Sequence, residues 1–373
     1  MKLQRKNRLR ALSLGAVAVS GALALTACGS DDTGNTTGGG KETAAKNIKC
    51  EDAKGQLLAI GSSAQKNAID AWNKQFAAAC QDVQLQYKPE GSGAGITAFL
   101  QGQVGFAGSD SALKPEEIEQ SKKVCKDSQA IDLPMVGGPI AVGYNVPGVD
   151  NLVLDAKTIA EIFDGKITSW DDEAIAKLNP DAELPKLKIQ AFHRSDESGT
   201  TDNFTKYLKG AAPDAWKYEP SKVWEAKGGQ SAAKSAGVAT QVKEVSGAIS
   251  YFELSYAEGI KTVDLKTEAA EPVKATIDNA SKAIAEAKVV GEGKDLALEL
   301  NYKPKAEGAY PITLVTYEIV CEKGNKPETL AATKAFLNYA ASVDGQKALT
   351  ANDYAPIPAD IIAKVRETVA AIS

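Results

Sequence analysis

Short apolar segments with two different periods alternate along most of the chain. Residues 57–60 form an apolar run, and apolar side chains then recur at helical spacing over residues 69–79. Residues 83–87 alternate as in a strand, and 139–144 and 248–252 are apolar runs that we interpret as further strands. This alternation predicts an α/β fold with a largely parallel sheet, in which ligands bind at the carboxyl ends of the strands.

The same pattern continues toward the C-terminus. Residues 187–191 are expected to form a strand leading to a helix that begins near residues 198–200, and 331–341 and 361–369 to form terminal helices. Residues 269–299 are rich in alanine and charge, which predicts a helix with flanking loops and no site. The chain has no internal repeat.

The first 27 residues have the pattern of an export signal. Five positive charges fall within residues 2–10, and residues 11–27 carry no charge and are rich in alanine. The segment ends in LTAC, residues 25–28, which resembles a bacterial lipobox. We therefore expect a lipoprotein signal peptide over 1–27, a lipid on Cys28 and a flexible tether over 28–47. The alternative is an ordinary signal peptide followed by an unmodified Cys28.

The charge balance limits the classes of partner. The formal net charge is −5, and removal of the five basic residues of the signal would change it to −10. An acidic protein gains nothing from contact with nucleic acid, so we expect no nucleic-acid partner. Any bound anion must be held by local hydrogen-bond donors and cations, because the net negative charge of the protein repels it.

Four cysteines follow the lipid site: Cys50, Cys80, Cys125 and Cys321. Export permits disulfides, and four cysteines allow three pairings. We favour Cys50–Cys80, because these two flank one strand–helix unit, which leaves Cys125–Cys321. CxxC and HxxxH spacings are absent and His193 is the only histidine, so we expect no metal site.

The motif FHRSDESGTTDNF, residues 192–204, has the chemistry of an anion site. A helix N-terminus offers unpaired N–H groups, Ser198 and Thr200 add hydroxyls, and Gly199 permits close approach of the backbone. Arg194 supplies a planar donor fork suited to a tetrahedral oxyanion, and Asp196 is expected to hold that arginine in place. The alternative is an N-cap with a surface arginine.

Two more Gly/Ser turns, residues 61–63 and 91–95, also open helices and could converge on the same cleft. Asp110 follows a strand, and a carboxylate beside an anion is costly unless it accepts a proton from that anion. HPO4²⁻ and H2PO4⁻ carry such a proton and sulfate does not, so Asp110 would select phosphate. The alternative role for Asp110 is an N-cap of the next turn.

Taken together, these motifs resemble those of the PstS family, the phosphate-binding lipoproteins of bacterial phosphate-specific ABC transporters. The similarity runs from about Leu57 to the C-terminal region. It is carried by GSGAGI (91–96), FAGSD (106–110), IFDGKITSWDDEAIAKLNP (162–180), RSDESGTTDNF (194–204), SGAISYFE (246–253) and YAPIP (354–358).

The resemblance implies a ligand set for inorganic phosphate. Its members would be Ser63 through hydroxyl and amide, the Ala64 amide, Gly93 with Ser92, and Asp110, Arg194, Ser198, Gly199 and Thr200. Some relatives have serine at the position of Gly93, so only an N–H would remain there unless Ser92 compensates. Some have phenylalanine at the position of Ala64, where the contact is through the backbone.

The resemblance also implies the fold and the partners. We expect the two-lobed type II periplasmic-binding-protein fold, in which each lobe is a mixed, mostly parallel sheet flanked by helices and hinge strands join the lobes. Lobe 1 would contain 48–137 plus 250–373, and lobe 2 would contain 138–249.

A monomer anchored through Cys28 at the outer face of the bacterial cytoplasmic membrane would bind phosphate and deliver it to permease subunits. We expect neither a cofactor nor an enzymatic activity. The alternatives are a carrier of another oxyanion, such as sulfate or molybdate, and an exported phosphatase. A phosphatase would need an activated nucleophile or a metal-bound water, for which the sequence offers no histidine–carboxylate cluster.

Overall fold

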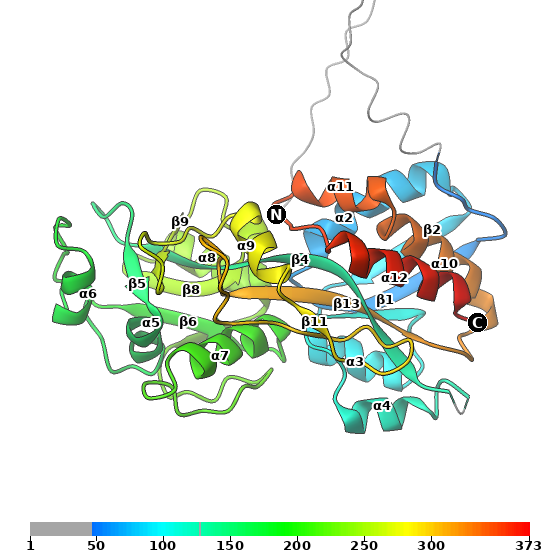
Figure 1. Ribbon diagram of the computed structural model, residues 1–373, viewed down its shortest axis with the longest axis horizontal. Helices are drawn as coiled ribbons and strands as arrows, with labels where there is room; N and C mark the ends of the chain where they lie inside the picture. The colour runs from blue at the N-terminus through cyan, green and yellow to red at the C-terminus, as the bar shows by residue number, and fades with distance from the viewer. Residues whose placement is uncertain (1–46, 127) are drawn as a thin grey trace, which may run out of the picture. The chain divides into compact units, whose positions relative to one another are not determined.

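The computed structural model describes residues 47–126 and 128–373, and its main feature is a sheet of nine strands (Figure 1). The predicted signal peptide, Cys28 and the tether up to residue 46 lie outside the described residues. No helix of the described part combines the length and the apolar character needed to span a bilayer.

In the main sheet the order of the strands differs from their order in the chain. The order is β2 (Val83–Lys88), β1 (Gly55–Gly61), β3 (Phe106–Ser109), β13 (Thr313–Cys321), β4 (Ala130–Asn145), β8 (Ala248–Glu253), β6 (Gln190–Arg194) and β7 (Gln230–Ala232), with β9 (Lys261–Thr262) also paired to β4. Two small sheets pair β5 (Val153–Asp155) with β10 (Asp264–Lys266), and β11 (Lys288–Val289) with β12 (Leu298–Glu299).

Helices cover the sheets and occupy most of the connections. They are α2 (Lys66–Ala79), α3 (Ser92–Leu100), α4 (Pro115–Ser121), α5 (Ala156–Phe163), α6 (Glu173–Leu178), α7 (Gly199–Ala211), α8 (Lys234–Glu244), the 3-10 turn η1 (Leu254–Tyr256), α9 (Ile277–Ile284), α10 (Pro327–Ala340), α11 (Val343–Thr350) and α12 (Ala359–Ala371). The expected terminal helices correspond to α10 and α12. The expected helix near residue 198 is α7, and the expected strand 187–191 lies slightly later, as β6.

Parallel pairs flank an antiparallel centre in the main sheet. Strands β1, β2 and β3 pair in parallel, and so do β6, β7 and β8. Strand β13 is antiparallel to both β3 and β4, and β4 is antiparallel to β8. The sheet is therefore mixed, as expected, but it is continuous from one end to the other.

Two hydrophobic cores lie on this sheet, and β4 and β13 run side by side from one to the other (Figure 1). In β4, Val136 belongs to the first core and Ile140 to the second; in β13, Leu314 belongs to the second core and Val315 to the first. The first core packs α2, α10, α11 and α12 around Phe336, and a smaller cluster extends it beneath α3.

The second core extends beyond the boundary expected at residue 249. It contains Phe163, Phe204 and Tyr251, and it continues through Val263, Leu265, Val273 and Ala275 and takes in Tyr310 and Ile312. The chain thus remains with the second core until about residue 275 and returns to it near 310, because β9, β10 and the segment before β13 pack there.

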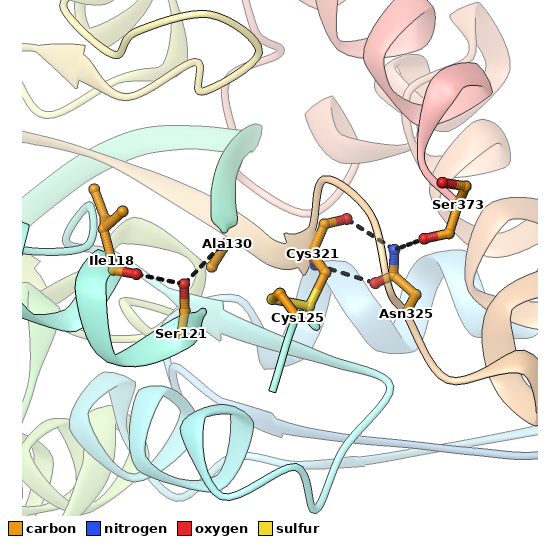
Figure 2. Close-up of a disulfide and its surroundings, with 7 residues drawn as sticks. All are labelled: Ile118, Ser121, Cys125, Ala130, Cys321, Asn325 and Ser373. Carbon is orange, nitrogen blue, oxygen red and sulfur yellow. Dashed lines mark hydrogen bonds between the residues drawn. A yellow bond between two sulfur atoms is a disulfide. The ribbon is translucent and has the colours of Figure 1, made fainter. Parts of the chain in front are cut away.

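The cysteines form the two disulfides that the sequence analysis favoured. Cys50 bonds to Cys80, on either side of β1 and α2, and Cys125 bonds to Cys321 across 196 residues of sequence. Figure 2 shows the second bond beside Asn325, whose side chain donates to the carbonyl oxygens of Cys321 and Ser373. This disulfide ties the segment after α4 to the end of β13, and the Asn325 side chain links that end to the C-terminus.

Candidate functional site

Arg194 is the last residue of β6 and is 2% exposed, so its guanidinium is buried. Its Nε donates to Asp196 Oδ1 at 2.8 Å and its Nη2 to Asp196 Oδ2 at 2.5 Å, a bidentate pair. Burial opposes ionisation of both groups, but the pair outweighs it: the pKa of Asp196 is lowered and the pKa of Arg194 is raised. Asp196 therefore has the expected geometry of a group that holds Arg194 in place.

The remaining nitrogen of Arg194 points toward the start of α7. Nη1 donates to Thr200 Oγ1 at 3.3 Å and to Ser235 Oγ at 3.1 Å. Helix α7 begins at Gly199, and Ser198 caps it by accepting from the Thr201 N–H. The first N–H groups of this helix have no carbonyl partner one turn earlier in the helix, so side chains or a ligand must accept from them, close to Arg194.

Asp110 follows β3 directly and is 3% exposed. Its Oδ2 accepts from Ser62 Oγ at 2.7 Å and from Ser92 Oγ at 3.3 Å, and its Oδ1 accepts from Thr316 Oγ1 at 2.7 Å. Burial, followed by the charge of Glu253, raises its pKa to about 6 against the lowering effect of Ser62, Thr316 and Arg194. Asp110 is thus a buried carboxylate at neutral pH, held by three hydroxyl groups.

Ser92, at the start of α3, connects Asp110 to α7. Its hydroxyl accepts from the Asp110 N–H at 3.1 Å and from the Gly199 N–H at 3.2 Å. A Cβ added to Gly199 would lie 2.6 Å from the Asp110 Cβ, so only glycine permits this approach. The α7 start and the Asp110 turn therefore meet directly, which the sequence motifs alone did not require.

The Gly93 N–H, another expected ligand donor, bonds to the segment before α7 in this structure. It donates to the Glu197 carbonyl at 3.0 Å, and a Cβ at this position would lie 2.5 Å from the Glu197 Cβ. In this structure Gly93 therefore packs against the segment before α7, and the Ser92 hydroxyl is the better-placed polar group of the two.

The Gly/Ser turn of residues 61–63 also reaches the cluster around Arg194 and Asp110. Ser63 Oγ lies 3.0 Å from Ser235 Oγ and accepts from the Ser235 N–H at 3.1 Å. The Ala64 N–H, an expected ligand donor, donates to Ser62 Oγ at 3.0 Å. All nine expected phosphate-binding residues are buried in one polar cluster, where the carboxyl ends of β1, β3 and β6 meet the starts of α3 and α7.

Three residues of this cluster were not expected from sequence: Ser235, Glu253 and Thr316. Glu253 ends β8, so its position after the AISYF strand gave a usable signal of the same kind as that for Asp110. Ser235 lies near the start of α8 and Thr316 lies inside β13, and only the tertiary structure brings these two to the site.

The architecture has the features of a binding protein built from two cores, and comparison with known proteins agrees. The family model described as "PBP superfamily domain" matches residues 49–344, so the chain belongs to this superfamily. Among solved structures, the chain superposes on the phosphate-binding protein of Stenotrophomonas maltophilia with a TM-score of 0.68 at 20% identity, covering 85% of this chain and 96% of that one. PfluDING, described as a high-affinity periplasmic phosphate-binding protein, gives 0.68 at 22% identity over 84% and 93%.

Closer relatives place the chain within one family. It is 42% identical over 363 residues to phosphate-binding protein PstS 3 of Mycobacterium tuberculosis, covering 96% of this chain and 97% of that protein. Identity to PstS of Haemophilus influenzae is 33% over 294 residues, covering 76% and 83%. The chain belongs to the PstS family of phosphate-binding proteins, which confirms the family and the fold expected from sequence.

Proposed function

We propose that this protein binds inorganic phosphate in the buried polar cluster and delivers it to an ABC permease for import. The observation that carries the proposal is the burial of Arg194 and Asp110 in one hydroxyl-rich cluster at the start of α7. The names of the PstS relatives support the same ligand.

The donors would come from both cores. Arg194, the Ser198–Thr200 segment and the helix N-terminus would neutralise the anion from one side, and Ser63, Ala64 and Ser92 would donate from the other. Several of these groups now satisfy one another, as in the Ser63–Ser235 and Ser92–Gly199 contacts, so phosphate would exchange these bonds for bonds to its own oxygens. Asp110 would accept the proton of HPO4²⁻ or H2PO4⁻, which sulfate lacks.

Closure of two lobes would complete the site. Asn203 on α7 donates to the Asp110 carbonyl at 2.7 Å, Ser111 to Asp202 at 2.6 Å, and Lys222 pairs with Glu117 at 3.3 Å. These contacts join elements of the second core to elements of the first. We propose that the lobes hinge where β4 and β13 pass between the cores, with the second lobe extended to about residue 275 rather than ending at 249.

We propose an extracytoplasmic location for this protein. Export by the predicted signal and a lipid on Cys28 would hold a monomeric protein at the outer face of the cytoplasmic membrane, where the closed form would dock on the permease subunits. The permease and its ATPase would supply the energy for import.

Calorimetric titration of the phosphate-free protein at neutral pH tests this function. One-to-one binding of phosphate with no heat from sulfate is the expected result. Equal binding of both anions would make Asp110 a structural cap and the protein a general oxyanion carrier. The absence of heat from either anion would overturn phosphate as the ligand.

A further inference from the structure

Glu253 occupies a second carboxylate position of the polar cluster. It is the last residue of β8, which lies parallel to β6, so Glu253 and Arg194 end neighbouring strands at the same edge of the sheet. Its side chain is 2% exposed, and its Oε1 accepts from Thr200 Oγ1 at 2.5 Å. Thr200 in turn accepts from Arg194, so Glu253 is one hydroxyl group away from the guanidinium.

The other carboxyl oxygen of Glu253 lacks a hydrogen-bond donor among the described residues, as do both carboxyl oxygens of Glu318 inside β13. Oε2 is buried, and no residue of the described chain donates a hydrogen bond to it. Asp110, in contrast, has both oxygens bonded to hydroxyl groups of Ser62, Ser92 and Thr316. A buried carboxylate oxygen without a donor is costly, on the order of 1–3 kcal/mol or more, so such an atom in a binding site points to a donor on the ligand.

The charges around Glu253 also favour a ligand that carries protons. The carboxyl groups of Asp110, Asp196 and Glu253 surround the single guanidinium of Arg194. The titratable and charged groups that face Glu253 from neighbouring elements are Arg194 on β6, Asp110 after β3, Tyr256 on η1 and Tyr354 before α12. Arg194 is therefore the one cation among these neighbours, and Asp196 already pairs with it. A dianion adds more repulsion to this set of carboxyl groups than a monoanion does.

We propose that Glu253 is a second residue of the site that accepts a proton of the ligand: its free Oε2 shares this proton with a ligand oxygen. Asp110 receives one acidic hydrogen of phosphate and Glu253 the other, so phosphate is held with the proton count of H2PO4⁻. Thr200 is the positioning residue, because its hydroxyl fixes Oε1 and thereby aims Oε2. This inference rests on the proposed phosphate site and specifies the protonation state that the site takes.

Proton uptake on binding is the direct test. At about pH 8 free phosphate is mainly HPO4²⁻, so binding with the proton count of H2PO4⁻ takes up about one proton from the buffer. Calorimetric titration of the purified protein with inorganic phosphate in two buffers of different ionisation enthalpy measures this number. The wild type is expected to take up about one proton at that pH and almost none at about pH 6.5, where most phosphate already carries both hydrogens and most Asp110, with its pKa of about 6, is still ionised.

Glu253→Gln is the matched variant, because the amide retains the acceptor for Thr200 and places an N–H where the shared proton would lie. It is expected to bind phosphate as HPO4²⁻, with almost no proton uptake at about pH 8. Glu258→Gln, an exposed position shortly after η1, serves as the control and keeps the wild-type uptake.

The outcomes separate this inference from the proposed function. Phosphate binding by the wild type without proton uptake overturns the role of Glu253 and leaves the phosphate site intact, and so does unchanged uptake in Glu253→Gln. If Glu253→Gln fails to fold, the wild-type comparison between the two pH values alone decides. The absence of phosphate binding by the wild type overturns both.

Discussion

Replacement of Asp110 by asparagine separates the stability cost of this residue from its binding role. In the folded protein the pKa of Asp110 is raised from 3.8 to about 6, chiefly by burial. The folded state therefore binds this proton more tightly than the unfolded chain, so stability falls as the pH rises through the window between these two values. This difference in pKa corresponds to about 3 kcal/mol that ionised Asp110 subtracts from the free energy of unfolding above pH 6.

Asparagine has a similar shape and does not ionise, so Asp110→Asn is expected to lack this pH-dependent loss. The free energy of unfolding of the variant relative to wild type should increase by about 2.5 kcal/mol between about pH 4 and pH 8. Urea unfolding of both phosphate-free proteins at several pH values in this range measures the difference. A constant difference over the whole range would refute the assignment of a buried, ionised Asp110.

Binding is expected to change in the opposite direction. Loss of a charged acceptor for the phosphate proton should weaken phosphate binding about 10- to 100-fold, as is typical of a hydrogen bond to a charged group. The asparagine side chain can instead donate to a fully ionised oxygen, so discrimination against sulfate should decrease. Calorimetric titration with both anions tests this, and unchanged selectivity would contradict the proton-acceptor role.

Three further changes probe other parts of the molecule. Arg194→Ala should weaken phosphate and sulfate alike by at least about 100-fold, because it removes the buried cation, and selective loss of phosphate alone in calorimetry would contradict this. Gly93→Ala should oppose closure through its clash with Glu197 and lower phosphate affinity, with thermal unfolding of the phosphate-free protein little changed; wild-type affinity would argue against the Gly93–Glu197 contact in the bound state. Replacing the Cys125–Cys321 pair with serine should cost about 5 kcal/mol in urea unfolding and the Cys50–Cys80 pair about 4 kcal/mol, because the longer loop loses more constraint on the unfolded chain; the reverse order would refute this account.

The local parts of the site were predictable from sequence because each has a short-range cause. Arg194, Ser198 and Gly199 belong to one strand–helix junction, where capping and helix polarity act within a few residues. Asp110 was predictable because a strand ends just before it. Residues such as Ser235 and Thr316 had no such signal, since they reach the cluster only through the order of strands in the sheet.

The long strand β4 was only partly predicted, for a physical reason. The part before residue 139 contains Pro134, Gly137 and Gly138, which normally argue against a central strand. In the structure the ladder to β13 shifts register between Thr316 and Tyr317, next to Pro134, so the missing N–H falls at an irregularity. The sequence therefore predicted the second half, 139–144, and missed the part that passes into the first core.

The polar cluster contains more carboxyl groups than cations, and this composition fits recognition by proton count better than recognition by charge. If attraction to a cation decided affinity, one arginine surrounded by Asp110, Asp196 and Glu253 would be a poor anion site, and phosphate and sulfate would differ little. Donors from Arg194, the α7 start and the hydroxyl groups can bind either anion, whereas the free acceptor on Glu253 and the carboxylate of Asp110 favour an anion that carries protons. The stability that the fold loses by burying Asp110 is then the cost of selectivity, a common relation between stability and function at binding sites.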